Sequence, residues 1–135
     1  MKIFIASKLK NEEQRALNEQ LAALCEEVGF EVLLPQRLLP LDTQKTAVEI
    51  LESNEHFVGT ADCILAVFDR AESGVAMELG RAHLLQKPII GFRTPTSIEN
   101  EDMGKMLHGF WERLPEHRKA TNFEELKGRL RQLLA

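Results

Sequence analysis

The sequence predicts an α/β fold in which an open, mostly parallel β-sheet is covered by helices on both faces. Short apolar segments alternate with longer segments whose apolar residues recur at helical spacing. The connections after the third and fourth apolar segments are short, as in chains that alternate strand and helix. With 135 residues the chain is long enough for one core and too short for two, so residues 1–135 are expected to form a single domain.

Apolar segments of strand length supply the sheet. The expected strands are residues 2–6, 30–34, 63–68 and 88–92. The third of them is apolar at every position, as expected for a central parallel strand with helices on both sides. A fifth strand is expected between Leu114 and Thr121, where its signal is weak. We therefore expect four or five strands.

Helical periodicity marks the segments between and after these strands. The expected helices are residues 11–28, 44–58, 74–86, 105–113 and 122–134. Gly29 suits the left-handed residue that ends many helices. Asn122 and Glu125 have the spacing of a capping box, which predicts the start of the last helix.

Two loops and one inward face complete the expected fold. Residues 35–43 contain two prolines and no clear period, and residues 94–104 are polar, so both segments are expected to be loops. In the second helix, Val48, Leu51 and Phe57 are expected to face inward.

Composition and charge exclude several classes of function. Apolar residues make up 44% and charged residues 28% of the chain, and the formal net charge is -4. This mild acidity argues against a nucleic-acid partner, which normally requires a basic face. Residues 2–6 lack the length of a signal peptide, and no apolar stretch approaches the roughly 20 residues that span a bilayer. We therefore expect a cytoplasmic protein without a membrane partner.

The cysteines and histidines give no sign of a metal site. Cys25 and Cys63 lie in periodic apolar segments, so they are expected to be reduced and buried. His56, His83, His108 and His117 lack metal-ligand spacing. The glycines at Gly74 and Gly80 match neither a phosphate loop nor a dinucleotide-binding loop. No metal or cofactor is expected.

Glu78 is the candidate functional residue that the expected topology singles out. Ligands of open α/β sheets bind at the carboxyl ends of the strands, near the switch in strand order. The helix that begins at Ser73 and Gly74 directs its free N–H groups and its positive dipole end to this edge. Glu78 lies in its first turns, where an ionised carboxylate is expected. Compensation of the helix dipole explains such a glutamate equally well and is the commoner use.

Other charged side chains gather around the third strand. Asp62 precedes it, Asp69 follows it, and Glu72 lies in the next loop. Asp62 also suits a turn or cap before the strand, and Ser73 with Gly74 also suits a plain helix start. Arg81 and Arg93 suit either anion contacts or surface ion pairs.

Several segments, in order, resemble the nucleoside 2-deoxyribosyltransferase family. The strongest are ADCILAVFD at residues 61–69, ESGVAMELGRA at residues 72–82 and QKPIIGFRT at residues 86–94. The opening KIFIAS at residues 2–7 and GFEVLLPQR at residues 29–37 fit the same pattern. The resemblance covers roughly residues 2–94 and is more specific than any single motif.

The resemblance implies a flavodoxin-like fold and a homo-oligomer whose sites borrow residues from a neighbouring chain. It places the nucleophile at Glu78, the aspartate that positions and protonates the departing base at Asp62, and the residue beside the sugar 5′ end at Glu72. Its substrate contacts are expected among Phe4, Ser7, Lys8, Gln36, Asp69, Glu72, Ser73 and Gly74.

The sequence departs from the family pattern at four positions. Phe4 stands where the family usually has a tyrosine, and the chain contains no tyrosine. Glu72 replaces a shorter aspartate, Arg70 rather than a glycine follows Asp69, and Lys105 lies near an asparagine that transferases offer to the adjacent subunit.

The implied chemistry is cleavage or transfer at an N-glycosidic bond. A carboxylate below C1′ can trap the deoxyribosyl group covalently, as in retaining glycosidases, and a second acid favours departure of the base. Nucleosides are preferred over monophosphates because Glu72 would repel a phosphate, although Lys8 and Arg93 offset this. The alternatives are a 2′-deoxynucleoside 5′-monophosphate N-glycosidase, a non-catalytic nucleotide-binding sensor, which Phe4 favours, and a structural α/β subunit.

An apolar cluster near the carboxyl terminus has two interpretations. It consists of Met103, Met106, Leu107, Phe110 and Trp111. The cluster forms either an interface of a dimer or larger oligomer or the packing of this segment onto its own sheet.

Overall fold

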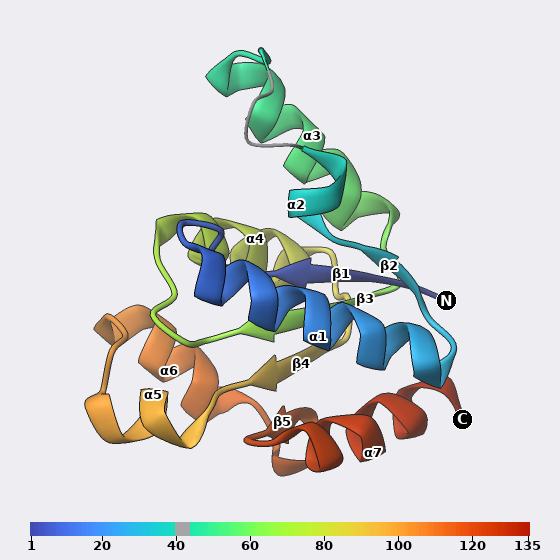
Figure 1. The fold of residues 1–135 in the computed structure, drawn as a ribbon, viewed down its shortest axis with the longest axis vertical. Helices are drawn as coiled ribbons and strands as arrows, with labels where there is room; N and C mark the ends of the chain where they lie inside the picture. Colours follow the sequence, from blue (N-terminus) through green and yellow to red (C-terminus); the bar gives the residue numbers. More distant parts are fainter. Residues whose placement is uncertain (40–43) are drawn as a thin grey trace.

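The strands form one open, fully parallel sheet. The computed structural model describes residues 1–39 and 44–135. Its strands are β1 (Lys2–Ala6), β2 (Glu31–Leu33), β3 (Cys63–Val67), β4 (Ile89–Phe92) and β5 (Lys119–Ala120). They lie in the order β2-β1-β3-β4-β5, and each neighbouring pair is parallel. The predicted fold class is confirmed, and the weakly signalled fifth strand is present (Figure 1).

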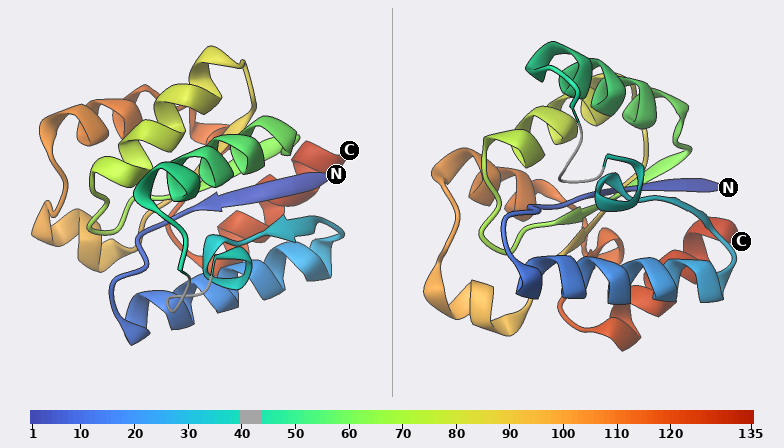
Figure 2. Two further views of the ribbon diagram at one scale, coloured as in Figure 1. Left: turned by 90° about the horizontal axis from the view of Figure 1, so that it is seen from above. Right: turned by 45° about the horizontal axis from the view of Figure 1, so that its top comes forward.

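Helices connect and cover the strands. They are α1 (Glu12–Val28), α2 (Pro35–Leu38), α3 (Ala47–Thr60), α4 (Ser73–Leu84), α5 (Pro95–Asn100), α6 (Lys105–Arg113), the 3₁₀ helix η1 (Glu116–Arg118) and α7 (Phe123–Leu134). Views from two further directions show helices on both sides of the sheet (Figure 2). The predicted alternation of strand and helix is therefore confirmed through β4.

Two short helices lie where loops were predicted. α2 begins at Pro35 and α5 at Pro95. Proline suits the first position of a helix because its fixed φ is already helical and its missing N–H would have no partner there. Thr94 also caps α5 by accepting a hydrogen bond from the Ser97 N–H. The prediction of loops was wrong here because proline starts a helix as readily as it interrupts one. Residues 40–43 of the first predicted loop lie outside the described residues.

Residues at the helix ends explain several of the observed boundaries. Gly29 ends α1 with φ of 122°, a value that favours glycine, and its N–H donates to two carbonyls of the last turn. Thr46 and Glu49 form a reciprocal capping box, so α3 begins three residues later than predicted. Asn122 caps α7 as predicted, but the Glu125 carboxylate accepts from Thr121 instead of the Asn122 N–H.

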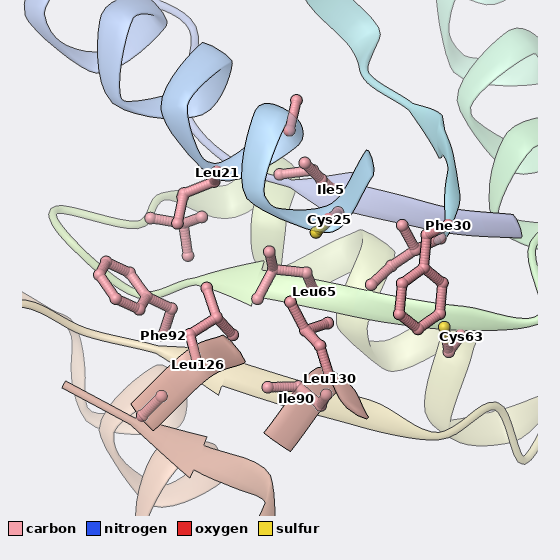
Figure 3. Packing of buried hydrophobic residues seen from close by; sticks show 14 of the residues in the cluster. Ile5, Leu21, Cys25, Phe30, Cys63, Leu65, Ile90, Phe92, Leu126 and Leu130 are labelled. Carbon is pink, nitrogen blue, oxygen red and sulfur yellow. The ribbon is translucent and has the colours of Figure 1, made fainter. Parts of the chain in front are cut away.

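Alternate strand residues face two apolar layers. Figure 3 shows the layer that α1 and α7 cover, with Leu21 and Cys25 of α1 above Leu65 of the central strand β3. On the opposite face α3, α4 and α6 cover the intervening strand residues, including Phe4 and Ile64. Both faces of β3 are buried, which explains why its sequence is apolar throughout.

The inward face predicted for α3 is wrong at two of its three positions. Val48 and Leu51 are 62% and 44% exposed, whereas Phe57 packs against the core and Val58 is buried. Figure 1 shows the reason: the amino-terminal half of α3 projects beyond the sheet. Helical spacing identifies a face, but it does not show how far along the helix that face meets the core.

The apolar carboxyl-terminal cluster packs mainly onto its own sheet. Leu107 and Trp111 are buried, and Met103 and Phe110 are partly buried against the same core. Met106 is 90% exposed. Gly91 of β4 makes this packing possible, because a Cβ there would lie 2.7 Å from Leu114 and 3.0 Å from both Phe68 and Trp111.

The two cysteines are free and buried, as predicted. Burial raises the pKa of each thiol to about 12, so both stay protonated. Across residues 1–39 and 44–135, no helix combines the length and apolar character that crossing a bilayer requires.

Candidate active site

Glu78 lines a small cavity between α3 and α4. The cavity measures about 170 Å³. Its walls are Leu51, Asn54, Glu55 and Val58 from α3, and Gly74, Met77, Glu78 and Arg81 from α4. Two helices that are neighbours in the chain order therefore enclose the residue that the sequence singled out.

The local sequence of α4 explains where Glu78 points. Val75, Leu79 and Ala82 are buried against the sheet, so Glu78, one residue before Leu79, falls on the flank of the helix that faces α3. Helical side chains tilt toward the helix amino terminus, and the residue one turn before Glu78 is Gly74. Within the described residues, a Cβ at Gly74 would have no heavy atom within 4 Å. The space beside Gly74, at the start of α4, is therefore open.

Burial controls the charge of Glu78. The loss of solvent raises its pKa to about 8, so the carboxyl is mainly protonated at pH 7. Leu51, Val58 and Met77 contribute the apolar part of the cavity wall. The prediction that Glu78 stays ionised is therefore wrong, because the cost of burying the charge exceeds the stabilisation that the helix dipole supplies.

Asn54 is a polar residue of this cavity that the sequence reasoning missed. Its Oδ1 atom is buried and has no hydrogen-bond partner among the described residues. A signal was present in the sequence, because Leu51, Asn54 and Val58 recur at helical spacing and so share one face of α3. A buried acceptor without a donor is costly, so Asn54 Oδ1 is a candidate to accept a hydrogen bond from a ligand.

An ion pair joins the two helices at the cavity. Arg81 Nη1 lies 3.2 Å from Glu55 Oε2, and both side chains are about two-fifths exposed, at 43% and 41%. Of the two roles predicted for Arg81, the surface ion pair is the one observed. Solvent screens such a pair, so it contributes little stability.

The loop after β1 meets the start of α4 through two lysines. Lys8 Nζ lies 2.7 Å from Glu72 Oε1, and Lys10 Nζ lies 3.2 Å from Glu72 Oε2. The hydrogen bond from Lys8, followed by that from Lys10, lowers the pKa of Glu72. Two ammonium groups and one carboxylate leave a net positive charge here. Glu72 thus lacks the free negative charge that the sequence-based argument against a phosphate assumed.

Ser7 and Gln36 belong to a hydrogen-bond network centred on buried Asn18. Ser7 Oγ donates to Asn18 Oδ1 at 2.6 Å, and Asn18 Nδ2 donates to Gln36 Oε1 at 3.1 Å and to the Lys8 carbonyl at 3.2 Å. Gln36 Nε2 in turn donates to the Arg15 carbonyl at 3.1 Å. These amides fix α2 and the β1–α1 loop on α1, away from the walls of the Glu78 cavity.

Asp62 does not lie in the cavity of Glu78. Its carboxylate accepts a hydrogen bond from the Lys2 N–H at 2.7 Å and so closes the amino ends of β1 and β3. The α4 helix, by contrast, follows the carboxyl end of β3. The resemblance implies that Asp62 acts on the departing base and so lies near Glu78; this expectation is wrong, and the turn role that competed with it is the one observed.

The remaining predicted contacts serve the fold in this structure. Asp69 accepts from the Thr94 N–H at 2.9 Å and from the Thr94 hydroxyl, which ties the loops after β3 and β4 together. Phe4 is fully buried in the core. Arg93, expected to contact an anion or a surface carboxylate, is 2% exposed and donates to the Ser97 hydroxyl and carbonyl, so both expectations were wrong. In the described part of the chain, no three His, Cys, Asp or Glu side chains are grouped to hold a metal ion.

Comparison with known proteins decides the family. The family model described as nucleoside 2-deoxyribosyltransferase matches residues 3–109. The chain belongs to the nucleoside 2-deoxyribosyltransferase family. The match includes Glu78, Asn54 and the whole cavity between α3 and α4. The resemblance found in the sequence is thereby confirmed, and a comparison with curated protein sequences gave no match.

Solved structures agree with the fold of this nucleoside 2-deoxyribosyltransferase family member. A conserved protein from Enterococcus faecalis V583 is 17% identical, with a TM-score of 0.81 over 98% of each chain. The 2-deoxyribosyltransferase of Bacillus psychrosaccharolyticus is 20% identical, with a TM-score of 0.74 over 94% of this chain and 90% of its own. The Clostridium botulinum CMP N-glycosidase BcmB is 17% identical, with a TM-score of 0.64 over 100% of both chains. Family membership and fold together support an activity at an N-glycosidic bond.

Proposed function

We propose that the protein cleaves or transfers at the N-glycosidic bond of 2′-deoxynucleosides, with Glu78 as the nucleophile. The observation that carries this proposal is a glutamate that lines a cavity, within the region that matches the family, and that burial holds mainly protonated. A carboxyl group with a pKa raised by burial is common at active sites, because structural roles rarely need a desolvated acid.

The reaction begins with deprotonated Glu78. One carboxylate oxygen bonds to C1′ while the bond from C1′ to the base nitrogen breaks, and the base keeps that electron pair and takes up a proton. A second base, or water, then attacks C1′ and loses a proton, while the bond from C1′ to the Glu78 oxygen breaks and frees the carboxylate. The first outcome is transfer and the second is hydrolysis.

The size of the cavity limits what it holds. Typical ligand sites measure roughly 300–1,000 Å³, whereas the space beside Glu78 measures about 170 Å³. We infer that it receives the sugar and that the base extends past its rim. Asn54 Oδ1, the unpartnered acceptor in the wall, is then available to a sugar hydroxyl.

A second candidate function is N-glycosidase activity on 2′-deoxynucleoside 5′-monophosphates. The observation that favours it is the net positive charge that Lys8 and Lys10 leave around Glu72. This charge lies at the start of α4, where free N–H groups also favour an anion. A 5′-phosphate placed there would be attracted rather than repelled.

Product analysis tests the proposal. The protein is incubated with deoxyinosine and free adenine and, separately, with deoxynucleoside monophosphates, and the products are separated by chromatography. A new nucleoside shows transfer, and free base alone shows hydrolysis. Binding without turnover by the unaltered protein would indicate a sensor instead.

A variant then assigns the nucleophile. Glu78→Gln keeps the shape of the protonated carboxyl but cannot trap C1′, so a sugar adduct seen by intact-protein mass spectrometry should disappear. Glu124→Gln, on the exposed surface of α7, is the matched control and should keep the adduct. Normal turnover by Glu78→Gln would exclude Glu78 as the nucleophile.

We also propose a homo-oligomer, as the family resemblance implies. Met106 is the residue of the carboxyl-terminal apolar cluster that remains on the surface of the single chain. Light scattering coupled to gel filtration measures the mass in solution, and Met106→Lys should shift it toward the monomer if this residue lies in the interface.

A further inference from the structure

We propose that a second, basic cavity binds a small molecule through its phosphate group. The cavity measures about 330 Å³ and lies at the amino ends of β4 and β5, between the end of α4, α6 and η1. Its walls are His83, Lys87, Ile89, Phe110, Arg113, Leu114, Pro115, His117 and Arg118. It shares no wall residue with the Glu78 cavity and stands independently of the proposed function.

The charge of this cavity is one-sided. Three of its wall residues, Lys87, Arg113 and Arg118, carry a permanent positive charge, and two more are histidines. None of the described residues in the wall is an aspartate or a glutamate. The whole chain has a formal net charge of -4, so such a concentration of cations departs from its average. Like charges around one hollow repel each other, and an anion between them removes that cost.

The arginines of the cavity have no carboxylate partner. Of the ion pairs formed by residues 1–39 and 44–135, none includes Arg113 or Arg118. The two glutamates nearest in sequence pair elsewhere: Glu112 with His108, and Glu116 with Lys119. Neither glutamate therefore forms an ion pair with Arg113 or Arg118.

The donors of two cations remain available for an anion. The Arg113 guanidinium stacks on the Phe110 ring, with Cζ 4.8 Å from the ring centroid. This cation–π contact uses none of the guanidinium N–H groups as donors, so they remain to match two oxygens of one phosphate. Lys87 Nζ donates to the Gly59 and Ala61 carbonyls at 3.0 and 2.7 Å, so one of its three N–H groups and its full charge remain.

The size of the cavity selects the class of ligand. At about 330 Å³ it falls within the range of small-molecule sites, which favours a small ligand over an extended polyanion. The geometry therefore favours inorganic phosphate or a single phosphate ester, such as a nucleotide. Inorganic phosphate tests recognition of the phosphate group that both ligands share. A nucleoside 5′-monophosphate tests whether the sugar and base of a nucleotide add a contact.

An amide chemical-shift titration with the full chain tests the proposal. Inorganic phosphate, added at constant ionic strength up to roughly 10 mM, should give saturable shifts at the amides of Lys87, Arg113 and Arg118. The double variant Arg113→Gln, Arg118→Gln should weaken this binding at least roughly tenfold. The matched control Arg131→Gln, Lys127→Gln removes the same charge from α7 and should leave it unchanged.

Two further arms separate the possible sources of phosphate binding. Lys8→Gln with Lys10→Gln removes the positive charge beside Glu72 and should not change the shifts around Arg113. If a nucleoside 5′-monophosphate binds more tightly than inorganic phosphate, and the arginine variant loses this binding, the ligand is a phosphate ester. If the two bind equally, the cavity recognises the phosphate group alone. The proposal is overturned if no shift saturates, or if the arginine variant, with an otherwise native amide spectrum, binds as well as the control.

Discussion

Asn54 of α3 and Glu78 of α4 line one cavity from opposite sides, although they lie 24 positions apart in the chain. Asn54 contributes a buried oxygen without a partner among the described residues, and Glu78 contributes a carboxyl group that burial keeps protonated. Both features cost stability in the free protein. Under the proposed function, a bound substrate would satisfy both groups.

Replacing Asn54 with leucine should separate stability from activity. Asn54→Leu removes the unpaired oxygen at similar volume, so the free energy of unfolding should rise by about 1 kcal/mol. Turnover should fall, because the acceptor proposed for the substrate is lost. Urea unfolding and product chromatography measure the two effects. A variant that is less stable and fully active would show that Asn54 is a packing residue.

The rate of the reaction should depend on the ionisation of Glu78. Its pKa is raised to about 8, and only the deprotonated carboxylate can attack C1′. The value of kcat/KM should therefore rise with pH and level off above pH 8, since it reports the free enzyme. Initial rates between pH 5 and pH 9.5 measure the profile. A rate that is constant from pH 5 to pH 7 would mean that the free-enzyme carboxyl is already ionised there.

The same carboxyl should make folding stability depend on pH. Its pKa is about 8 in the folded chain and near 4.5 in the unfolded chain, so between these values the folded state binds more protons. Raising the pH through this window therefore destabilises the native protein, by at most about 5 kcal/mol in total. Glu78→Gln lacks this titration, so its advantage over the wild type in urea unfolding should grow from pH 5 to pH 9. An advantage that does not change with pH would contradict the raised pKa.

Gly91 should tolerate no side chain. A Cβ at this position would lie within 3.0 Å of Leu114, Phe68 and Trp111, so Gly91→Ala should lower the free energy of unfolding by about 1–3 kcal/mol. Gly128→Ala is the matched control, because Gly128 lies inside α7 and its Cβ would meet no described atom within 4 Å. Alanine should stabilise that helix by up to about 1 kcal/mol. Equal effects of the two substitutions would contradict the close packing at Gly91.

Lys8 should distinguish the two candidate substrates. Lys8→Gln removes the closer ammonium of the pair around Glu72, so a phosphate at the start of α4 would lose part of its attraction. KM should rise severalfold for a deoxynucleoside monophosphate and change little for a deoxynucleoside. Steady-state kinetics with both substrates give the comparison, with Lys127→Gln as the control for lost surface charge. An unchanged KM for the monophosphate would exclude a phosphate contact with Lys8.

The sequence by itself determined the alternation of strands and helices, the family, and Glu78 as the candidate residue. These features are local: the apolar run of residues 63–67 defines a buried strand, and the residues around Glu78 are consecutive in the chain. Short-range periodicity and motif spacing therefore suffice to find them. The two short helices were missed because proline marks both the interruption and the start of a helix.

Tertiary structure decided which side chains meet and how they ionise. Asn54 lines the same cavity as Glu78, and Asp62 does not, because α3 packs beside α4 while Asp62 lies at the amino end of β3. The protonation of Glu78 follows from the same packing, since desolvation depends on the atoms that surround a carboxyl in space and not on its neighbours in sequence. The separation of the basic cavity from the Glu78 cavity has the same origin, because helices of one domain bring together residues that the sequence keeps apart.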